Sequence, residues 1–196
     1  MTDEMKKKIF DSAVNGIITT KKISELGIRR SALTELTESE ELVKCSRGIY
    51  MVVDEWEDEF YLLQKRYTRG IFSHATALYL LGYSERVPIS FHMTFVNNYN
   101  SLSLKDENVS VTRVIPDNFE LGITTAPTPS GNIVKVYDVE RCLCDMVKGA
   151  GTDIQTVQFA MKKYAASKEK DVNRLMQYAK QLRVEKKIRN YMEVLL

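Results

Sequence analysis

Residues 16–50 read GIITTKKISELGIRRSALTELTESEELVKCSRGIY. Two short helical segments, 21–26 and about 28–39, flank Gly27, which permits a sharp turn between them. Two strand-like runs, 42–45 and 49–52, then flank Ser46-Arg47-Gly48, a composition typical of a tight turn. This order of helix, turn, helix and hairpin predicts a winged helix-turn-helix, a fold that presents one helix and one loop to a DNA duplex.

A further helix is expected upstream, over about residues 3–14, and Asn15-Gly16 should end it. Thr19 or Thr20 can cap the helix 21–26, in which Ile23 and Leu26 should face the core. Helical spacing also predicts an inward-facing stripe on the first helix, made of Met5, Ile9, Phe10, Ala13 and Val14.

The helix over 28–39 has two different sides. Ala32, Leu33 and Leu36 gather on one side when residues are advanced by 100° each. The opposite side begins with basic and hydroxyl side chains and ends with acidic ones, so its first half suits phosphate oxygens and base edges. We therefore predict groove contacts from Arg30, Ser31 and Thr34. Backbone or wing contacts are predicted from Lys21, Lys22, Arg29, Lys44 and Arg47.

The acidic run 54–59 marks the expected domain boundary and should open a helix reaching about Thr68, because negative charge favours a helix N-terminus. Beyond it, 91–96, 109–115 and 133–137 are rich in β-branched and aromatic residues and predict strands. From Asp138 onward the apolar spacing is helical again. The sequence thus predicts an α+β chain with a winged helix over 1–53 and a small sheet covered by helices over 54–196.

Length and composition limit the class of protein and the compartment in which it is expected. The chain has 196 residues, 44% hydrophobic, and a formal net charge of +2, which is too small to mark the whole chain as a polyanion binder. Three cysteines cannot all pair, and the N-terminus lacks the apolar run of a signal peptide. No window approaches the length of a membrane span. We expect a cytoplasmic protein with no membrane association.

Positive charge is concentrated near the C-terminus, where residues 162–193 carry ten Lys and Arg against four Asp and Glu. Such a face either keeps the helices in solution or contacts a DNA backbone or an acidic partner. The second candidate basic surface comprises Lys180, Arg183, Lys186 and Lys187.

Catalytic patterns are weak. His74 and His92 are the only histidines, and we expect a structural role for His74 at a helix start and for His92 in a strand. Cys45, Cys142 and Cys144 read as packing residues, and 149–152 as a loop. Asp138 should cap a helix with Glu140 in its first turn. We predict no enzyme, metal site or cofactor; an enzyme would require Asp138, Glu140 and Asp145 to meet in one open cleft.

Three blocks carry a family resemblance. They are the pattern 16–50, the segment Gly70-Ile71-Phe72-Ser73-His74-Ala75-Thr76-Ala77-Leu78 with Leu81-Gly82-Tyr83, and the segment Tyr137-Asp138-Val139-Glu140-Arg141-Cys142-Leu143-Cys144-Asp145-Met146-Val147. In this order they resemble the AbiEi-like antitoxins, the abortive-infection E regulators of bacterial type IV toxin-antitoxin systems.

The resemblance implies a repressor of its own toxin-antitoxin operon, and an antitoxin that counters a nucleotidyltransferase-like toxin through its C-terminal domain. Both a direct toxin complex and an action without contact are compatible with the sequence. Because one winged helix binds modestly, we expect two copies to cooperate on an inverted repeat of operator DNA. The alternative is an adaptor that uses the winged helix and the basic C-terminal helices to bind a partner protein.

Overall fold

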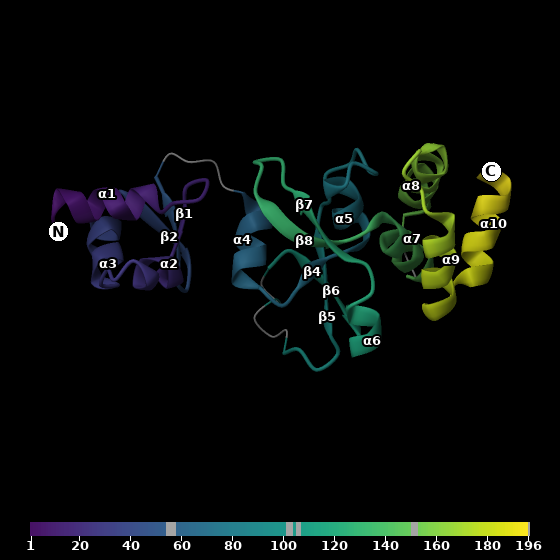
Figure 1. Ribbon diagram of the computed structural model, residues 1–196, viewed down its shortest axis with the longest axis horizontal. Helices are drawn as coiled ribbons and strands as arrows, with labels where there is room; N and C mark the ends of the chain where they lie inside the picture. The colour runs from purple at the N-terminus through teal and green to yellow at the C-terminus, as the bar shows by residue number, and fades with distance from the viewer. Residues whose placement is uncertain (54–57, 101–103, 105–106, 150–152, 196) are drawn as a thin grey trace. The chain divides into compact units, whose positions relative to one another are not determined.

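The computed structural model describes residues 1–53, 58–100, 104, 107–149 and 153–195. Within these residues it has an α+β fold with ten helices, one three-stranded sheet and one five-stranded sheet (Figure 1), which confirms the predicted fold class. The chain divides into two compact units, Met1–Thr68 with Thr128–Asn132, and Arg69–Pro127 with Ile133–Leu196. The sequence predicted a boundary after residue 53. In the structure, residues 58–68 and the turn 128–132 pack with the N-terminal elements instead of the second unit.

The first unit alternates short helices and strands. Its elements are α1 (Asp3–Asp11), β1 (Ile17–Thr19), α2 (Thr20–Glu25), α3 (Ser31–Glu38), β2 (Leu42–Ser46), β3 (Ile49–Val52) and α4 (Glu59–Arg66). The strands form an antiparallel sheet in the order β1-β3-β2. Strand β1 was not predicted from the sequence, because three residues are too few to form a periodic pattern. Helix α1 ends at Asp11, and Asn15 and Gly16 take positive φ angles of 47° and 74° in the following turn.

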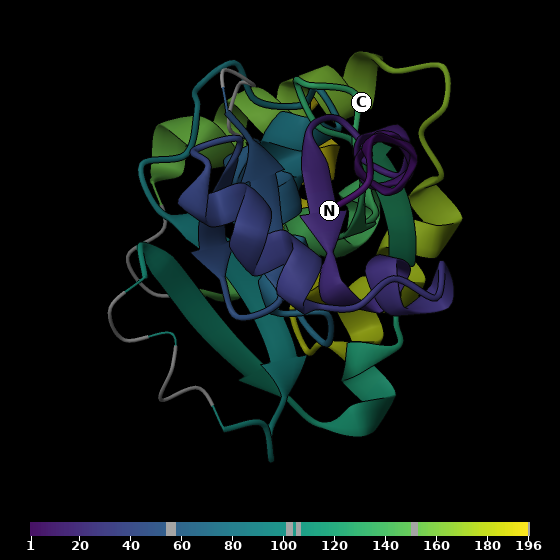
Figure 2. The ribbon, with the colours of Figure 1, turned by 90° about the vertical axis from the view of Figure 1, so that its left-hand side faces the viewer.

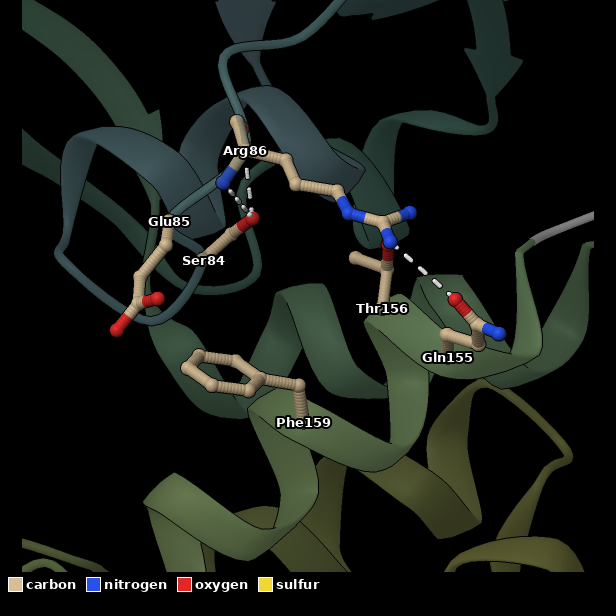
Figure 3. A pocket seen from close by; sticks show the side chains of 6 residues that line it. All are labelled: Ser84, Glu85, Arg86, Gln155, Thr156 and Phe159. Atoms are coloured by element: carbon tan, nitrogen blue, oxygen red, sulfur yellow. Dashed lines mark hydrogen bonds between the residues drawn. The ribbon is translucent and has the colours of Figure 1, made fainter.

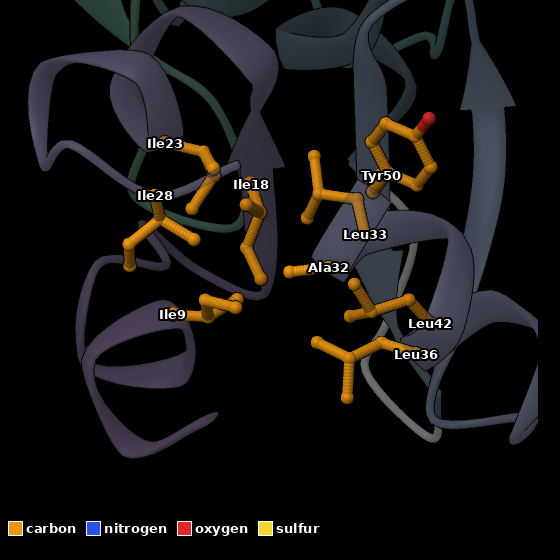
Figure 4. Close-up of a cluster of buried hydrophobic side chains, with 9 residues drawn as sticks. All are labelled: Ile9, Ile18, Ile23, Ile28, Ala32, Leu33, Leu36, Leu42 and Tyr50. Atoms are coloured by element: carbon orange, nitrogen blue, oxygen red, sulfur yellow. The ribbon is translucent and has the colours of Figure 1, made fainter. Parts of the chain in front are cut away.

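One apolar cluster holds α1, α2 and α3 on the sheet (Figure 4). Its buried members are Ile9, Ile18, Ile23, Ile28, Ala32, Leu33, Leu36, Leu42 and Tyr50, with Met5, Phe10 and Ala13 packed against them. The predicted inward positions of Val14 and Leu26 are wrong, because these side chains are 53% and 43% exposed. Val14 lies beyond the end of α1, and Leu26 is the C-cap of α2, so neither keeps the helical direction that the periodicity assumed.

Buried polar groups join α4 to the turn 128–132 within the first unit. Asp58 caps α4 by accepting from the backbone N of Tyr61 at 3.1 Å. Its Oδ2 accepts from Thr128 Oγ1 at 2.5 Å and from Asn132 Nδ2 at 2.8 Å. Asn132 Oδ1 in turn accepts from Asn15 Nδ2 at 2.7 Å. The acidic residues 54–57 of the predicted boundary helix lie outside the described residues, and the described helix starts at Glu59.

The second unit is built on a mixed sheet in the order β6-β5-β4-β8-β7. Figures 1 and 2 show its strands from two directions. Its strands are β4 (Ile71–Phe72), β5 (Phe91–Val96), β6 (Val109–Val114), β7 (Ile123–Pro127) and β8 (Ile133–Tyr137). Pairing is parallel for β5 with β6 and for β4 with β8, and antiparallel for β4 with β5 and for β7 with β8. The three predicted strands are confirmed, whereas β4 is too short and β7 too exposed to be read from an apolar pattern.

In the part of this unit that the structure describes there are six helices: α5 (His74–Leu80), α6 (Pro116–Phe119), α7 (Val139–Lys148), α8 (Ile154–Ala166), α9 (Val172–Gln181) and α10 (Glu185–Leu195). Aspartates cap three of them, since Asp138, Asp153 and Asp171 accept from backbone N–H groups in the first turns of α7, α8 and α9. Helix α7 is buried along most of its length and packs against α5, α8 and α9. Among the described residues, no helix has the length and apolar character needed to cross a membrane.

Candidate nucleic-acid interface

Helix α2 is placed by its cap and by the turn that follows. The Thr19 side chain accepts from the backbone N of Lys22 at 3.3 Å, and Ile23 is completely buried. Gly27 has φ +71°, and a Cβ there would meet nothing within 4 Å. Glycine is therefore favoured at this position by its backbone angle, and no neighbouring atom requires the absence of a side chain. Lys21 and Lys22 are exposed on the first turn of α2.

Helix α3 begins at Ser31, three residues later than predicted, because residues 28–30 still belong to the turn. Ile28 N donates to Ile23 O at 3.1 Å, closing that turn over α2. Arg30 is the N-cap residue, and its Nε donates to Ser24 Oγ at 3.4 Å. Ser31 and Thr34 are exposed, while Ala32, Leu33 and Leu36 fill the core. The side of α3 that was predicted to read DNA therefore faces away from the apolar cluster.

The β2-β3 hairpin reaches the start of α2. Thr20 N donates to Gly48 O at 2.9 Å. Gly48 has φ +79°, and a Cβ on it would lie 2.8 Å from Thr20 Oγ1, so only glycine allows this approach. Arg47, next to Gly48, is exposed, and so is Lys44 on β2. The hairpin contact thus places the Arg47 backbone close to the two lysines of α2.

All eight residues predicted to contact DNA are exposed. They lie on α2, the turn between α2 and α3, α3 itself and the β2-β3 hairpin, all in the first unit. They are Lys21, Lys22, Arg29, Arg30, Ser31, Thr34, Lys44 and Arg47. Six of them are cationic. The exposed acids of α2 and α3 are Glu25, Glu35 and Glu38. Glu35 and Glu38 lie in the second half of α3, and Glu35 forms an ion pair with the N-terminal amine at 3.5 Å.

Two supporting residues were not read from the sequence. Arg66 of α4 donates from Nη2 to the backbone O of Cys45 at 3.1 Å and so holds the β2 end of the hairpin. Ser24 orients Arg30, as described above. Arg66 lies 21 positions after Cys45 and carries no local motif, so no sequence signal could have paired them. Ser24 follows Thr20 by one helical turn and donates to its backbone O at 2.9 Å, a common serine contact that gives no hint of Arg30.

The second candidate basic surface lies in the other unit, around the α9-α10 junction. Lys180, Arg183, Lys186 and Lys187 are all exposed. Lys187 Nζ donates to Val147 O at 2.8 Å, which gives this lysine a structural role as well. Arg183 has φ 62°, in the left-handed region, at the residue after the α9 C-cap.

The two histidines meet, which the sequence did not indicate. Their rings stack with centroids 5.4 Å apart, and His74 Nδ1 lies 2.9 Å from Ser73 Oγ. Burial, and then the charge of Arg141, lower the pKa of His74 to about 4. Burial, and then His74 itself, lower the pKa of His92. Both rings are therefore neutral at pH 7, in line with the structural roles predicted for them.

The carboxylates of α7 do not converge. Asp138 caps the helix as predicted, with Oδ1 accepting from Arg141 N at 2.8 Å. Asp145 pairs with the completely buried Arg141 at 2.9 Å, whereas Asp138 and Glu140 line a pocket that does not include Asp145. Within the described residues, no group of three His, Cys, Asp or Glu could hold a metal ion.

The cysteines fall into two classes. Cys142 and Cys144 are fully buried, as predicted, and burial raises the pKa of the Cys144 thiol to about 12. Cys45 in the hairpin is only half-buried, because β2 lies at an edge of its sheet, so the prediction of a buried Cys45 is wrong. Residues 150–152 of the predicted loop lie outside the described residues.

Comparison with known proteins shows the fold alone. No family model matches the chain, and no curated protein matches it. Among solved structures, the chain is similar to the crystal structure of the RV2827C protein from Mycobacterium tuberculosis, with a TM-score of 0.61 and 19% identity. The similarity covers 90% of this chain and 70% of that one. This likeness extends over both units of the fold.

Proposed function

We propose that this protein is a transcriptional repressor whose first unit binds operator DNA as a winged helix-turn-helix. The carrying observation is that the eight exposed side chains of α2, the following turn, α3 and the hairpin form a mainly cationic set, while the apolar sides of the same elements face the core. The order of helices and strands, with the strand order β1-β3-β2, supports the same proposal.

The proposed division of work follows from the positions of the side chains. Arg30, Ser31 and Thr34 lie on the first half of α3, where a recognition helix meets base edges. Lys21, Lys22 and Arg29 flank that helix and contact phosphates, and Lys44 and Arg47 do so from the hairpin. With about half a dozen phosphate contacts, one unit binds modestly, so two copies occupy an inverted repeat.

The test is fluorescence anisotropy with a labelled duplex from the promoter upstream of the gene for this chain. Arg30→Ala should weaken binding by about 1–3 kcal/mol and reduce the preference over unrelated duplex. Lys7→Ala is the matched control, since it removes one exposed cation from α1, outside the helix-turn-helix. Equal effects of the two variants would remove the assignment of Arg30.

Salt dependence separates this proposal from the adaptor alternative. A DNA-binding unit must lose affinity for duplex steeply as salt rises, because each neutralised phosphate releases counterions. Affinity for duplex that is negligible at low salt, in a folded protein, would favour an adaptor that binds another protein. Duplexes with one and two half-sites would show whether the two copies cooperate.

We further propose that the chain is an AbiEi-like antitoxin and that its second unit counters a nucleotidyltransferase-like toxin. The support is the three-block sequence resemblance, of which one block spans β4 and α5 of this unit and another spans most of α7. Co-expression of the toxin from the neighbouring gene with full-length Arg30→Ala is the test. Growth should be rescued even though operator binding is weakened. Continued growth arrest with a soluble, folded variant would contradict the proposal.

A further inference from the structure

The second unit contains a pocket of about 590 Å³ that the proposed repressor and antitoxin activities leave without a role. This volume lies in the range of small-molecule sites. Its walls come from segments distant in sequence: the end of α5, the turn before β7, the start of α7, and helices α8 and α9. A smaller hollow of about 180 Å³ is lined by Arg86, whose guanidinium is already bonded to Gln155 (Figure 3). The same guanidinium also pairs with Asp153.

The pocket has a strong excess of negative charge. Four carboxylates line it, those of Glu120, Asp138, Glu140 and Glu169, against the single guanidinium of Arg174. Arg174 is already engaged, because its Nη2 donates to Glu140 Oε1 at 3.0 Å. The described residues offer no group of three His, Cys, Asp or Glu for a metal ion. An organic cation fits this charge better than a metal does.

One carboxylate oxygen of Glu140 in the wall has no donor among the described residues and is open to a ligand. The Glu140 side chain is only 4% exposed. Among the described residues, its hydrogen bonds all go to Oε1, from Tyr164 OH at 3.2 Å, from Asp171 N at 3.4 Å and from Arg174. Oε2 is thus left as an acceptor on a side chain that lines the pocket. Oε2 is not one of the fully enclosed side-chain atoms that lack a partner, so water or a ligand donor can reach it.

The carboxylate of Asp138, which also lines the pocket, is held rigidly. Asp138 N donates to Gly122 O at 2.7 Å, and Asp138 Oδ2 accepts from Tyr178 OH at 3.2 Å. A Cβ on Gly122 would lie 2.9 Å from Asp138 Oδ1, so the chain approaches this carboxylate as closely as glycine permits. Burial raises the pKa of Asp138, a shift that a bound cation would reduce. Burial also raises the pKa of Tyr178 to about 12, so its phenol stays a neutral donor.

We propose that this pocket binds a guanidinium group carried on an alkyl chain. A guanidinium presents several N–H donors in one plane, which suits the carboxylates of Asp138 and Glu140 on the same wall. Tyr83 and Tyr178, which are partly exposed, also line the pocket and offer aromatic surface to the flat cation and its alkyl stem. The source is either an arginine side chain of a partner protein or a free small molecule. This site is independent of DNA binding by the first unit.

The test uses 1-butylguanidinium and its uncharged isostere 1-butylurea with the full-length protein. We expect saturable binding of butylguanidinium by calorimetry, with butylurea about tenfold weaker or worse, because hydrogen bonds to a charged group are stronger. Amide chemical shifts should move at Gly122, Asp138–Glu140 and Tyr178. Absence of saturation, equal binding of the two probes, or shifts confined to other residues would each overturn the proposal.

Variants test the carboxylates. Asp138→Asn keeps a capping side chain and removes the charge, and it should weaken butylguanidinium about tenfold. Glu193→Gln is the matched control on the exposed side of α10, away from the pocket, and should change nothing. If Asp138→Asn does not fold, Glu120→Gln at an exposed position of the wall replaces it, with a smaller expected loss. An unchanged affinity in the folded wall variant would contradict the site.

A short peptide, acetyl-Gly-Arg-Gly-amide, distinguishes the two sources. Tighter binding than butylguanidinium would indicate a protein side chain, and weaker binding would indicate a free small molecule. Either result supports a guanidinium site, and binding of neither probe overturns it.

Discussion

Arg30 and Ser24 join the two helices of the proposed DNA-binding motif, with Arg30 Nε 3.4 Å from Ser24 Oγ. The bond uses the inner nitrogen of the guanidinium, and the Arg30 side chain is otherwise exposed. Ser24 on α2 therefore limits the orientations of the Arg30 guanidinium in the protein without DNA. A side chain that is oriented in advance loses less conformational entropy on binding.

Ser24→Ala should accordingly weaken specific binding by about 0.5–1 kcal/mol, the net worth of one hydrogen bond. Binding to unrelated duplex should change little, because the charge of Arg30 remains. Anisotropy titrations with both duplexes measure the difference. Ser12→Ala, at the end of α1, is the control, and a loss of the same size in that variant would show that Ser24 does not act through Arg30.

Gly48→Ala should destabilise the first unit and weaken DNA binding. The new Cβ would meet Thr20 Oγ1 at 2.8 Å, and the backbone would keep φ +79°. We expect about 1–3 kcal/mol lower free energy of unfolding, measured with urea. Gly131→Ala is matched for backbone angle, with φ +84°, but its Cβ would meet nothing within 4 Å. A loss in Gly48→Ala no larger than that in Gly131→Ala would show that the hairpin contact is not tight.

Stability should fall as the pH drops below 6.5, because His74 is buried neutral. Its folded pKa of about 4 lies below the unfolded value of 6.5, so the unfolded state binds the proton first. The contribution is complete above pH 6.5 and is lost as the pH falls toward 4, amounting to about 2 kcal/mol between pH 7 and pH 5. The lowered pKa of His92 acts in the same direction.

Urea unfolding at a series of pH values checks this prediction. His74→Asn is the informative variant, because asparagine tolerates the positive φ of 51° at this position and does not titrate. Burial raises the pKa values of Asp138 and Asp145, which acts against the histidines as the pH falls. The difference between the parent and His74→Asn isolates the histidine. Parallel curves for the two proteins would contradict the assignment.

Asp145→Asn should be among the most destabilising single changes in the second unit. Arg141 is completely buried and donates from Nε to Asp145 Oδ2 at 2.9 Å, so the variant leaves a buried cation without its counterion. We expect a loss of about 3–5 kcal/mol in the free energy of unfolding. Glu185→Gln breaks the exposed pair with Arg189, at 2.8 Å, and should cost about 1 kcal/mol or less. Similar losses in the two variants would show that Asp145 does not neutralise Arg141.

Local sequence determined the elements of this protein wherever neighbouring residues fix the backbone. Turns, helix starts and strands follow from contacts within a few residues. The determining features are Gly27 and Gly48, the Thr19 cap, and the runs 91–96 and 133–137, which are rich in β-branched and aromatic residues. The same reasoning fixed which side of α3 is apolar, and therefore which side is left for a ligand.

Only the tertiary structure decided which distant residues meet. His74 stacks on His92, Arg66 holds Cys45, and Glu140 joins Arg174 in the wall of a pocket. These contacts depend on strand order and helix packing, which bring together segments that no local pattern relates. The short strands β1 and β4 have the same origin, because pairing with partner strands defines them and their own two or three residues do not.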